Sequence, residues 1–248
     1  MKRIKLLLKL LLLVLFVANL VLVTKLVYED EQTQRRVEKK FDDIRQSFVG
    51  DITGAPDEVY IDGSVTVIKD LRAQNSDVIG YMSIPNSTIA YPVMQSPDEP
   101  DFYLNHDINK EYSFYGTPYL SAYCTLQESD NLIIYGHNIN GGRMFGQLLQ
   151  YKNKEFFENH KEIEFVTSKK DIYRIFAVFS VSINDFEYWK FVMAKNEGEY
   201  KEFISKATGH SCFNTGVTPS YGDKLITLST CDNARGNNYR FVVMGVKK

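Results

Sequence analysis

The stretch LITLSTCDNARGNNYRF, which runs from Leu225 to Phe241, is the part of the sequence that most directly indicates the fold. A strand-like apolar run ends on Cys231, and the segment DNARGNN that follows is rich in turn-forming residues. A second strand-like run then begins near Arg240. This order predicts a hairpin-like return of the chain, which would bring Arg240 back beside Cys231.

Further short apolar runs bounded by turn residues precede this hairpin. With its two strands they give eight strand candidates: VIGYMSI, IAYPVM, GTPYLSAY, NLIIYG, IEFVTS, DIYRIFAVFSV, KLITLST and YRFVVMGV. Two other stretches have helical character, GRMFGQLLQY after the fourth candidate and NEGEYKEFISKA before the seventh. So many strands without regularly alternating helices predict a mainly β fold, a closed eight-stranded barrel that is antiparallel or mixed, with a helix inserted before the cysteine strand.

The composition is that of a globular protein with an appendage. The 248 residues suffice for one sizeable domain, and 44% hydrophobic with 24% charged residues are ordinary values for a chain that buries a core. Lys and Arg number 29 against 31 Asp and Glu, so the formal net charge is -2 and no strongly basic domain is present. Nucleic acid is therefore not an expected partner.

The N-terminal segment predicts a membrane anchor. Residues 6–27 are predominantly apolar and long enough to cross a bilayer as a helix. A cleaved signal peptide is the alternative, but no A-x-A-like cleavage site follows the apolar core. Basic residues precede the span and YEDE follows it, so the positive-inside rule places residues 1–5 in the cytoplasm as a short tail and everything after the span outside the cell.

Residues 28–70 are expected to connect this anchor to the barrel as a juxtamembrane helix and linker. An amphipathic helix that packs on the main domain, rather than a solvated stalk, is predicted by four apolar residues at helical spacing: Val37, Phe41, Ile44 and Phe48. The run GDITGAPDEVYIDGS that follows is rich in Gly, Asp and Pro, and it is expected to be loop or linker. Residues 71–248 then form the β-barrel domain, which carries the candidate catalytic residues.

The chain has three cysteines, Cys124, Cys212 and Cys231. In an extracellular domain this odd number leaves at least one thiol unpaired, and both one disulfide with one free thiol and three free thiols are possible. Cys231 lies where a strand meets turn formers, so its thiol is expected at a rim that a substrate can reach, as a nucleophile requires. The alternative is a buried, inert cysteine.

A thiol nucleophile needs a proton acceptor or a cationic neighbour, and His137 is the best placed of the four histidines. It closes the run NLIIYGHN, in the same strand-to-rim context as Cys231. Tyr135 shares its face of the strand, and Gly136 leaves room for a close approach.

The other histidines have weaker claims. His106 in FYLNHD is expected to serve in capping or core hydrogen bonding, and His160 lies in a charged run where it is expected to be solvated. His210 is two positions from Cys212, so this pair is a competitor for metal or redox work. No second ligand pair at zinc spacing supports it.

Arg240 is the candidate for stabilising developing negative charge. A guanidinium can donate several hydrogen bonds to a carbonyl oxygen that becomes negative during attack. An ordinary surface arginine in a salt bridge is an equally open interpretation, and Arg235 in the turn is a rival, although a strand holds Arg240 more rigidly. The chain contains no G-x-S-x-G elbow, P-loop, dinucleotide fingerprint, H-E-x-x-H pair or EF-hand loop.

The run TLSTC that ends at Cys231, the arginine nine residues later in YRFVVMG, and the upstream YGHN around His137 resemble the sortases, cysteine transpeptidases of Gram-positive bacterial surfaces. The resemblance covers roughly residues 78–248. The N-terminal anchor, the helical material before the barrel, the helix-bearing insertion and the run FYLNHD are similar to class B members. The resemblance implies a sortase-type barrel that needs no cofactor and no metal, since the acidic loops that bind calcium in class A enzymes are not evident.

The resemblance also implies a role for each candidate residue. Cys231 would attack the carbonyl after the threonine of a sorting signal and form an acyl thioester. His137 would protonate the leaving amine and deprotonate the incoming one, and Arg240 would stabilise the oxyanion with help from a backbone N–H at Asp232. The other residues that the resemblance assigns to substrate binding are Tyr135, Ser229, Leu104 and Tyr188.

The partners implied by the resemblance are secreted proteins with a C-terminal sorting signal, an amino group of peptidoglycan or its lipid-linked precursor, and the membrane through the N-terminal helix. Two alternatives stay open. The chain could be another cell-wall cysteine enzyme, an L,D-transpeptidase or an amidase, although their S-H-G-C or Cys-first arrangements are absent. It could also be an anchored binding module in which Cys231 is inert.

Overall fold

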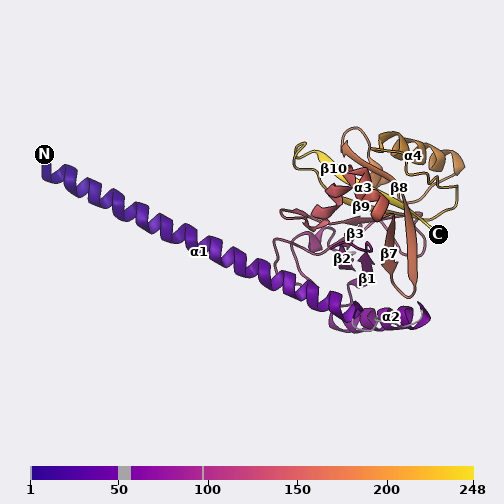
Figure 1. Cartoon of the computed structure of the whole chain (residues 1–248), viewed down its shortest axis with the longest axis horizontal. Coiled ribbons are helices and arrows are strands. Elements are labelled where there is room, and N and C mark those ends of the chain that lie inside the picture. Colours follow the sequence, from indigo (N-terminus) through magenta and orange to yellow (C-terminus); the bar gives the residue numbers. More distant parts are fainter. Residues whose placement is uncertain (1, 50–56, 97) are drawn as a thin grey trace. The chain divides into compact units, whose positions relative to one another are not determined.

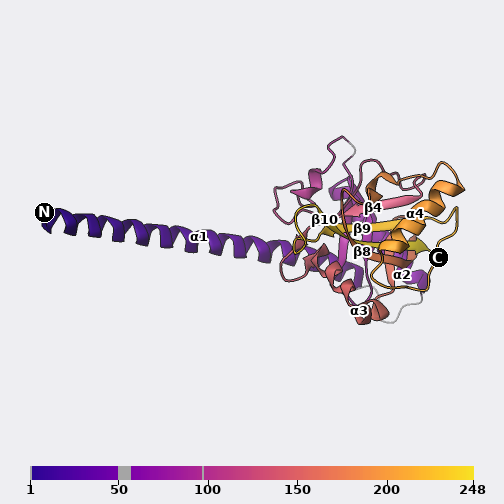
Figure 2. The same ribbon diagram turned by 90° about the horizontal axis from the view of Figure 1, so that it is seen from above.

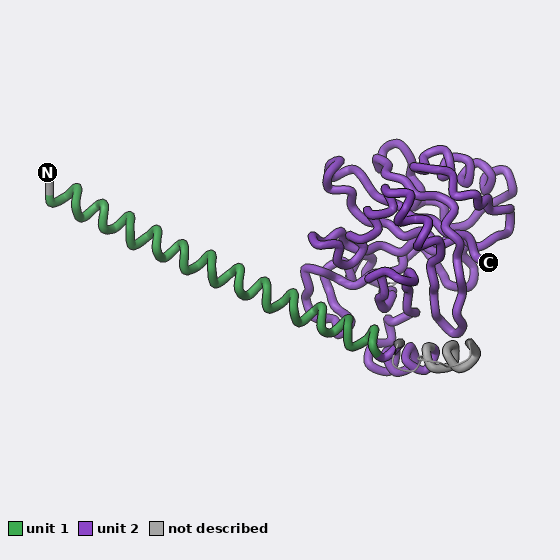
Figure 3. Tube along the Cα trace, viewed as in Figure 1, with its two compact units in different colours: residues 1–46 green, residues 47–248 purple. Residues whose placement is uncertain are grey.

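The computed structural model describes residues 2–49, 57–96 and 98–248. The chain divides into two compact units, residues 1–46 and 47–248 (Figure 3), and each is described by itself. Helix α1, Lys2–Val49, makes up the first unit and continues into the second. It contains a stretch that is long and apolar enough to cross a membrane, which fits the anchor predicted for residues 6–27.

The C-terminal part of α1 contains the predicted amphipathic helix. Phe48, which belongs to the second unit, is buried, and its ring stacks on that of Tyr81 with the ring centroids 3.7 Å apart. Tyr81 lies on the first strand of the barrel, so this aromatic pair forms within the second unit.

The prediction of a loop or linker for the run GDITGAPDEVYIDGS is wrong from Asp57 onward. Residues 50–56 lie outside the described residues, but helix α2, Asp57–Gln74, begins directly after them and includes the rest of GDITGAPDEVYIDGS. Its second half buries Ile68 and Leu71, and α2 packs against the first strand. Arg72 near its end donates hydrogen bonds to the carbonyl groups of Val78 and Ile79. This tertiary packing outweighs the poor helix propensity of the glycine within the helix.

The eight strand candidates all form strands, and together they close into a barrel with the order β1-β2-β3-β4-β9-β10-β8-β7 (Figures 1 and 2). Their bounds are β1 Val78–Ser83, β2 Ala90–Met94, β3 Tyr119–Leu120, β4 Asn131–Tyr135, β7 Glu162–Val166, β8 Lys170–Ser182, β9 Leu225–Cys231 and β10 Tyr239–Lys247. The predicted closed eight-stranded, mainly β fold is therefore confirmed. Successive side chains along each strand point to opposite faces of the sheet, and most of them are buried.

The barrel is mixed rather than wholly antiparallel. The pairs β2–β3 and β4–β9 are parallel, and the other pairs in the barrel are antiparallel. Strands β9 and β10 form the predicted hairpin, joined by the turn-rich segment of residues 232–238. The parallel pair matters for function, because parallel strands end at the same edge of a sheet.

Shorter elements connect the strands. They are η1 Phe102–Leu104, β5 Asn138–Ile139, β6 Arg143–Met144, η2 Phe145–Lys152, α3 Lys154–Asn159, η3 Tyr188–Lys190 and α4 Glu197–His210. The helix predicted from GRMFGQLLQY is the 3₁₀ helix η2, while the small β5–β6 hairpin and α3 were not predicted.

Helix α4 is the predicted inserted helix, and it covers β8 on the outside of the barrel (Figures 1 and 2). Asn196 caps its N-terminus by accepting a hydrogen bond from the backbone N–H of Glu199. The buried face of α4 is the one that the helical spacing predicted, and its residues are Tyr200, Phe203, Ile204 and Ala207. An aromatic layer of Phe186, Tyr188 and Phe191 lies beside them, and together they form one apolar cluster with side chains of β8, β9 and β10 on the outside of the barrel.

Candidate active site

Three neighbouring strands bring the predicted catalytic residues to one rim of the barrel. Strands β4 and β9 are parallel, with Tyr135 opposite Ser229. His137 and Cys231 lie two residues further along their chains, so the parallel register carries both to the same edge. Strand β10 pairs with the other side of β9, and Arg240 is the direct partner of Cys231.

A cleft of about 540 Å³ opens at this rim. Cys231 is half-buried in its wall, so the residue is not sealed in the barrel interior. Six other residues predicted for the site also line the cleft: Leu104, Tyr135, His137, Tyr188, Ser229 and Arg240. One cavity thus contains a thiol, an imidazole and a guanidinium, the groups that an acyl transfer through a cysteine requires.

Backbone carbonyl groups hold the guanidinium of Arg240 at the rim. Its Nη1 donates to the carbonyl oxygens of Asn237 at 2.8 Å and Tyr239 at 3.1 Å. Within the described parts of the chain, no carboxylate forms an ion pair with Arg240. Direct partners on antiparallel strands have Cβ atoms about 5 Å apart, so the remaining donors suit an oxygen on the carbon that Cys231 attacks.

The imidazole of His137 is oriented by a single backbone group. Its Nε2 lies 2.9 Å from the carbonyl oxygen of Leu104. A carbonyl can only accept a hydrogen bond, so Nε2 carries a proton in this contact, and Nδ1 is the ring nitrogen left to exchange a proton with another group. Gly136 permits this placement, because a Cβ there would lie 2.7 Å from the ring of Phe145.

The floor of the cleft is formed by polar groups that are buried. The hydroxyl groups of Tyr188 and Ser229 lie 2.6 Å apart, and both residues are 1% exposed. Burial raises the pKa of Tyr188 to about 12, although the hydrogen bond to Ser229 acts in the opposite direction. Burial also raises the pKa of Tyr135. Both phenols are therefore neutral at physiological pH.

The structure places Asp232 elsewhere than predicted. Its backbone N–H, expected at the oxyanion, instead donates to the carbonyl oxygen of Tyr239 at 3.0 Å as part of the β9–β10 connection. Its carboxylate is fully buried, forms an ion pair with Lys152 at 2.8 Å and accepts a hydrogen bond from Ser180 at 2.7 Å. Asp232 does not line the cleft. The backbone N–H is used by the pairing of β9 with β10, and strand alternation turns the side chain away from the face of Cys231.

Several residues at the site were not identified from the sequence. Asn138 donates through Nδ2 to the carbonyl oxygen of Cys231 at 2.9 Å, and Lys152 reaches Asp232, so the segment that follows His137 is tied to the cysteine strand at two points. Tyr123 and Trp189 line the cleft. The position of Asn138 directly after His137 was a usable signal, whereas Lys152 at the end of η2, Trp189 in η3 and Tyr123 in a loop reach the site through tertiary contacts that have no sequence signature.

The remaining cysteines and histidines take structural positions. All three thiols are free, and Cys124 is buried with its Sγ donating to the carbonyl oxygen of Asn131. Cys212 is exposed, and the ring of His210 stacks on that of Phe186 instead of facing a ligand. Among the described residues, no group of three potential metal ligands is present. His106 bonds through Nδ1 to the carbonyl oxygen of Phe102, as expected for a capping role.

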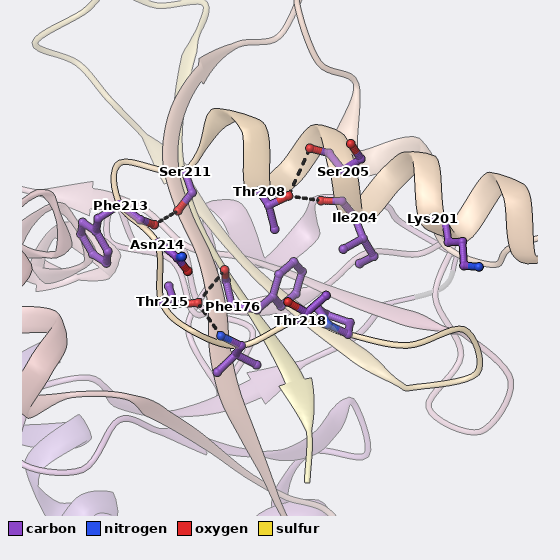
Figure 4. A pocket seen from close by; sticks show the side chains of 12 residues that line it. Phe176, Lys201, Ile204, Ser205, Thr208, Ser211, Phe213, Asn214, Thr215 and Thr218 are labelled. Carbon is purple, nitrogen blue, oxygen red and sulfur yellow. Dashed lines mark hydrogen bonds between the residues drawn. The ribbon is translucent and has the colours of Figure 1, made fainter.

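A second hollow of about 560 Å³ lies between α4 and the loop of residues 211–219 (Figure 4). Its hydroxyl groups bond within the protein: Thr208 donates to the carbonyl oxygen of Ile204, Ser211 to that of Phe213, and Thr215 to that of Phe176. None of the residues predicted for the site lines it. These bonds lie within α4, within the loop, and between the loop and β8, so the three hydroxyl groups are already used inside the protein, and the rim cleft is the better candidate for chemistry.

Comparison with known proteins gives one consistent family. Residues 82–248 match the model of the sortase domain. Sortase B of Listeria monocytogenes is 32% identical over 181 residues, which cover 72% of each chain. The X-ray structure of Clostridium perfringens sortase B is 30% identical, with a TM-score of 0.68, and the match covers 73% of this chain and 98% of that one. A Staphylococcus aureus sortase B–substrate complex has the same fold, with a TM-score of 0.78 at 24% identity and coverage of 88% and 98%.

Proposed function

Because this chain belongs to the sortase family and is a cysteine transpeptidase, we propose that it cleaves a C-terminal sorting signal after threonine and attaches the protein to an amino group of peptidoglycan or its lipid-linked precursor. The observation that carries this proposal is the shared cleft, in which Cys231, His137 and Arg240 meet from three adjacent strands. A substrate complex of a relative with the same fold supports a peptide as the ligand of this cleft.

In the first half of the proposed reaction, the thiol of Cys231 passes its proton to His137, and the sulfur attacks the carbonyl carbon of the threonine. Arg240 donates hydrogen bonds to the oxygen while it carries negative charge. The C–N bond then breaks, and His137 gives its proton to the leaving amine. The product is a thioester between Cys231 and the shortened protein, and the C-terminal fragment departs.

In the second half, an amino group replaces the departed fragment. Its nitrogen attacks the thioester carbonyl, the new C–N bond forms, and the C–S bond breaks. His137 takes up a proton from the amine, and the sulfur of Cys231 is released. Water in place of the amine would give hydrolysis, so the choice of acceptor makes the enzyme a transpeptidase rather than a protease.

We also propose that α1 spans the cell membrane with its N-terminus inside, which places the barrel outside, where secreted proteins and peptidoglycan are found. The length and apolar composition of α1 support the anchor, and the basic residues before the apolar stretch support the orientation. Accessibility of single engineered cysteines to a membrane-impermeant thiol reagent tests this orientation in whole cells.

Mass spectrometry of the intact enzyme, incubated with a panel of peptides that carry threonine-containing sorting signals, tests the proposed reaction. We expect a mass increase equal to the N-terminal part of one peptide, located on Cys231, and no increase in the Cys231→Ala variant. Muropeptides are included in the panel, because processing of muropeptides alone would indicate the alternative cell-wall enzyme. An adduct on Cys212 would contradict the assignment of the nucleophile.

A further inference from the structure

Phe114 is an exposed aromatic residue placed directly beside the proposed general base. Phe114 is 63% exposed, although its neighbours in the sequence, Ser113 and Tyr115, are buried. The ring lies nearly parallel to the imidazole of His137, with an interplanar angle of 9° and a centroid separation of 6.4 Å. Single exposed apolar residues are common on protein surfaces, so the informative observation is this alignment with a reactive group.

The loop that carries Phe114 is built to hold this position. The carboxylate of Asp107 accepts hydrogen bonds from the backbone N–H groups of Asn109 and Glu111, and the N–H of Ser113 donates to the carbonyl oxygen of Asn105. Gly116 closes the loop at a φ of +57°, where a Cβ would come within 2.5 Å of two carbonyl oxygens. The exposed ring therefore extends from an ordered support.

The path of the acceptor amine is limited by the chemistry. The amine that enters takes the place of the amine that left, and His137 handles a proton in both steps. The acceptor must therefore approach the thioester on the side where His137 lies. The ring of Phe114 lies beside that of His137, but Phe114 is not among the residues that line the cleft, so it lies next to the base and beyond the binding site of the donor peptide.

We propose that the exposed face of Phe114 binds the peptide chain that carries the acceptor amino group and so favours aminolysis of the thioester over hydrolysis. This inference rests on the proposed transpeptidation. An aromatic face suits the methylene groups and planar peptide groups that adjoin a primary amine, and it gives water no comparable contact. In the step concerned, the neutral amine attacks the thioester, the C–N bond forms, the C–S bond to Cys231 breaks, and the amine loses one proton to His137.

The test measures how much of the thioester reacts with an acceptor amine and how much reacts with water. The full-length enzyme in detergent micelles is given a sorting peptide that ends one residue after the scissile bond, which keeps the leaving segment short. Triglycine and Nα-acetyl-lysine amide serve as acceptor probes over a range of concentrations. The ratio of aminolysis product to hydrolysis product rises linearly with acceptor concentration, and its slope is independent of how much enzyme is folded or how fast the thioester forms.

For Phe114→Ala we expect the slope to fall by about three- to tenfold for at least one probe, the effect of losing one aromatic contact. Phe114→Tyr keeps the ring and should restore the slope to within about twofold of the original. Tyr112→Ala is the matched control, because Tyr112 is 75% exposed on the same loop but contacts His106 instead of His137. Its slope should stay unchanged.

An unchanged slope in Phe114→Ala for both probes, or an equal fall in Tyr112→Ala, would overturn the inference. A proportional loss of hydrolysis and aminolysis would do the same, since it would mean that Phe114 only supports the imidazole. Failure of the unaltered enzyme to form any thioester is a separate result, which refutes the proposed function and this inference with it.

Discussion

The ion pair between Lys152 and Asp232 gives the sharpest test of how the cysteine strand is held. The carboxylate of Asp232 is fully buried directly after Cys231, and Lys152 lies 2.8 Å from it, while Ser180 supplies one further hydrogen bond. Removing one partner of a buried ion pair costs about 3–5 kcal/mol, because the other charge is left without compensation. The side chain of Lys152 is 41% exposed, which lets water replace part of its contribution. We therefore expect Lys152→Met to lower the free energy of unfolding by about 2–3 kcal/mol.

The matched control is Lys224→Met. Lys224 forms an ion pair of the same 2.8 Å length with Asp130, and its side chain is also 41% exposed, but the carboxylate of Asp130 is 19% exposed instead of 0%. Water can solvate that carboxylate after the substitution, so the expected cost is about 1 kcal/mol or less. The two variants thus differ mainly in the burial of the anion.

Urea unfolding of the full-length chain in detergent micelles, followed by the fluorescence of the single tryptophan, Trp189, measures both variants. With an m-value of about 2 kcal/mol/M, the midpoint should fall by about 1 M for Lys152→Met. The double variant Lys152→Met/Asp232→Asn, in which the buried group is neutral, should recover part of the loss. Equal effects in Lys152→Met and Lys224→Met, within about 0.5 kcal/mol, would refute the reasoning from burial.

Three further predictions concern the cleft and the core. Arg240→Lys should lower kcat/KM for a sorting peptide by about 10²- to 10³-fold, because a point charge does not reproduce the guanidinium fork; a near-normal value would return Arg240 to an ordinary surface role. Iodoacetamide should leave Cys124 unmodified in the folded chain, since it is 1% exposed and burial raises the pKa of its thiol, and peptide mapping before and after unfolding checks this. The pKa of Tyr188 is raised to about 12, so its contribution to stability is complete below about pH 10 and is lost as the pH rises towards 12. Between pH 9 and pH 11 the unaltered protein should therefore lose about 1 kcal/mol more stability than Tyr188→Phe, and equal losses would contradict the assignment.

The strands were predictable because each is a short apolar run between turn-forming residues, a signal that lies wholly within the run. The convergence of Cys231 and Arg240 was predictable for a similar reason, since a hairpin needs only its own turn. The proximity of His137 to Cys231 rested on the resemblance instead. It depends on the parallel pairing of Tyr135 with Ser229, a contact between distant parts of the chain that local patterns do not encode.

The incorrect predictions also arise where contacts between distant parts of the chain outweigh the local sequence pattern. The segment that begins at Asp57 was assigned to a linker from its Gly and Asp content, but packing of Ile68 and Leu71 stabilises it as a helix. The backbone N–H of Asp232 was assigned to the oxyanion by resemblance, whereas the β9–β10 connection uses it in a hydrogen bond to the carbonyl oxygen of Tyr239. Trp189 reaches the cleft from the short 3₁₀ helix η3 inside the long β8–β9 connection, and periodicity does not describe the path of such a connection.

Because β4 and β9 pair directly, the distance between the imidazole of His137 and the sulfur of Cys231 does not depend on how long the chain between these strands is. Hydrogen bonds between the two strands fix how far apart the imidazole and the sulfur lie, so insertions or deletions in the surface segments between these strands leave the spacing intact. A single residue added inside either strand would instead shift one group by about 3.3 Å and turn it to the opposite face. Changes in length should therefore preserve activity in the outer loops and abolish it within β4 or β9.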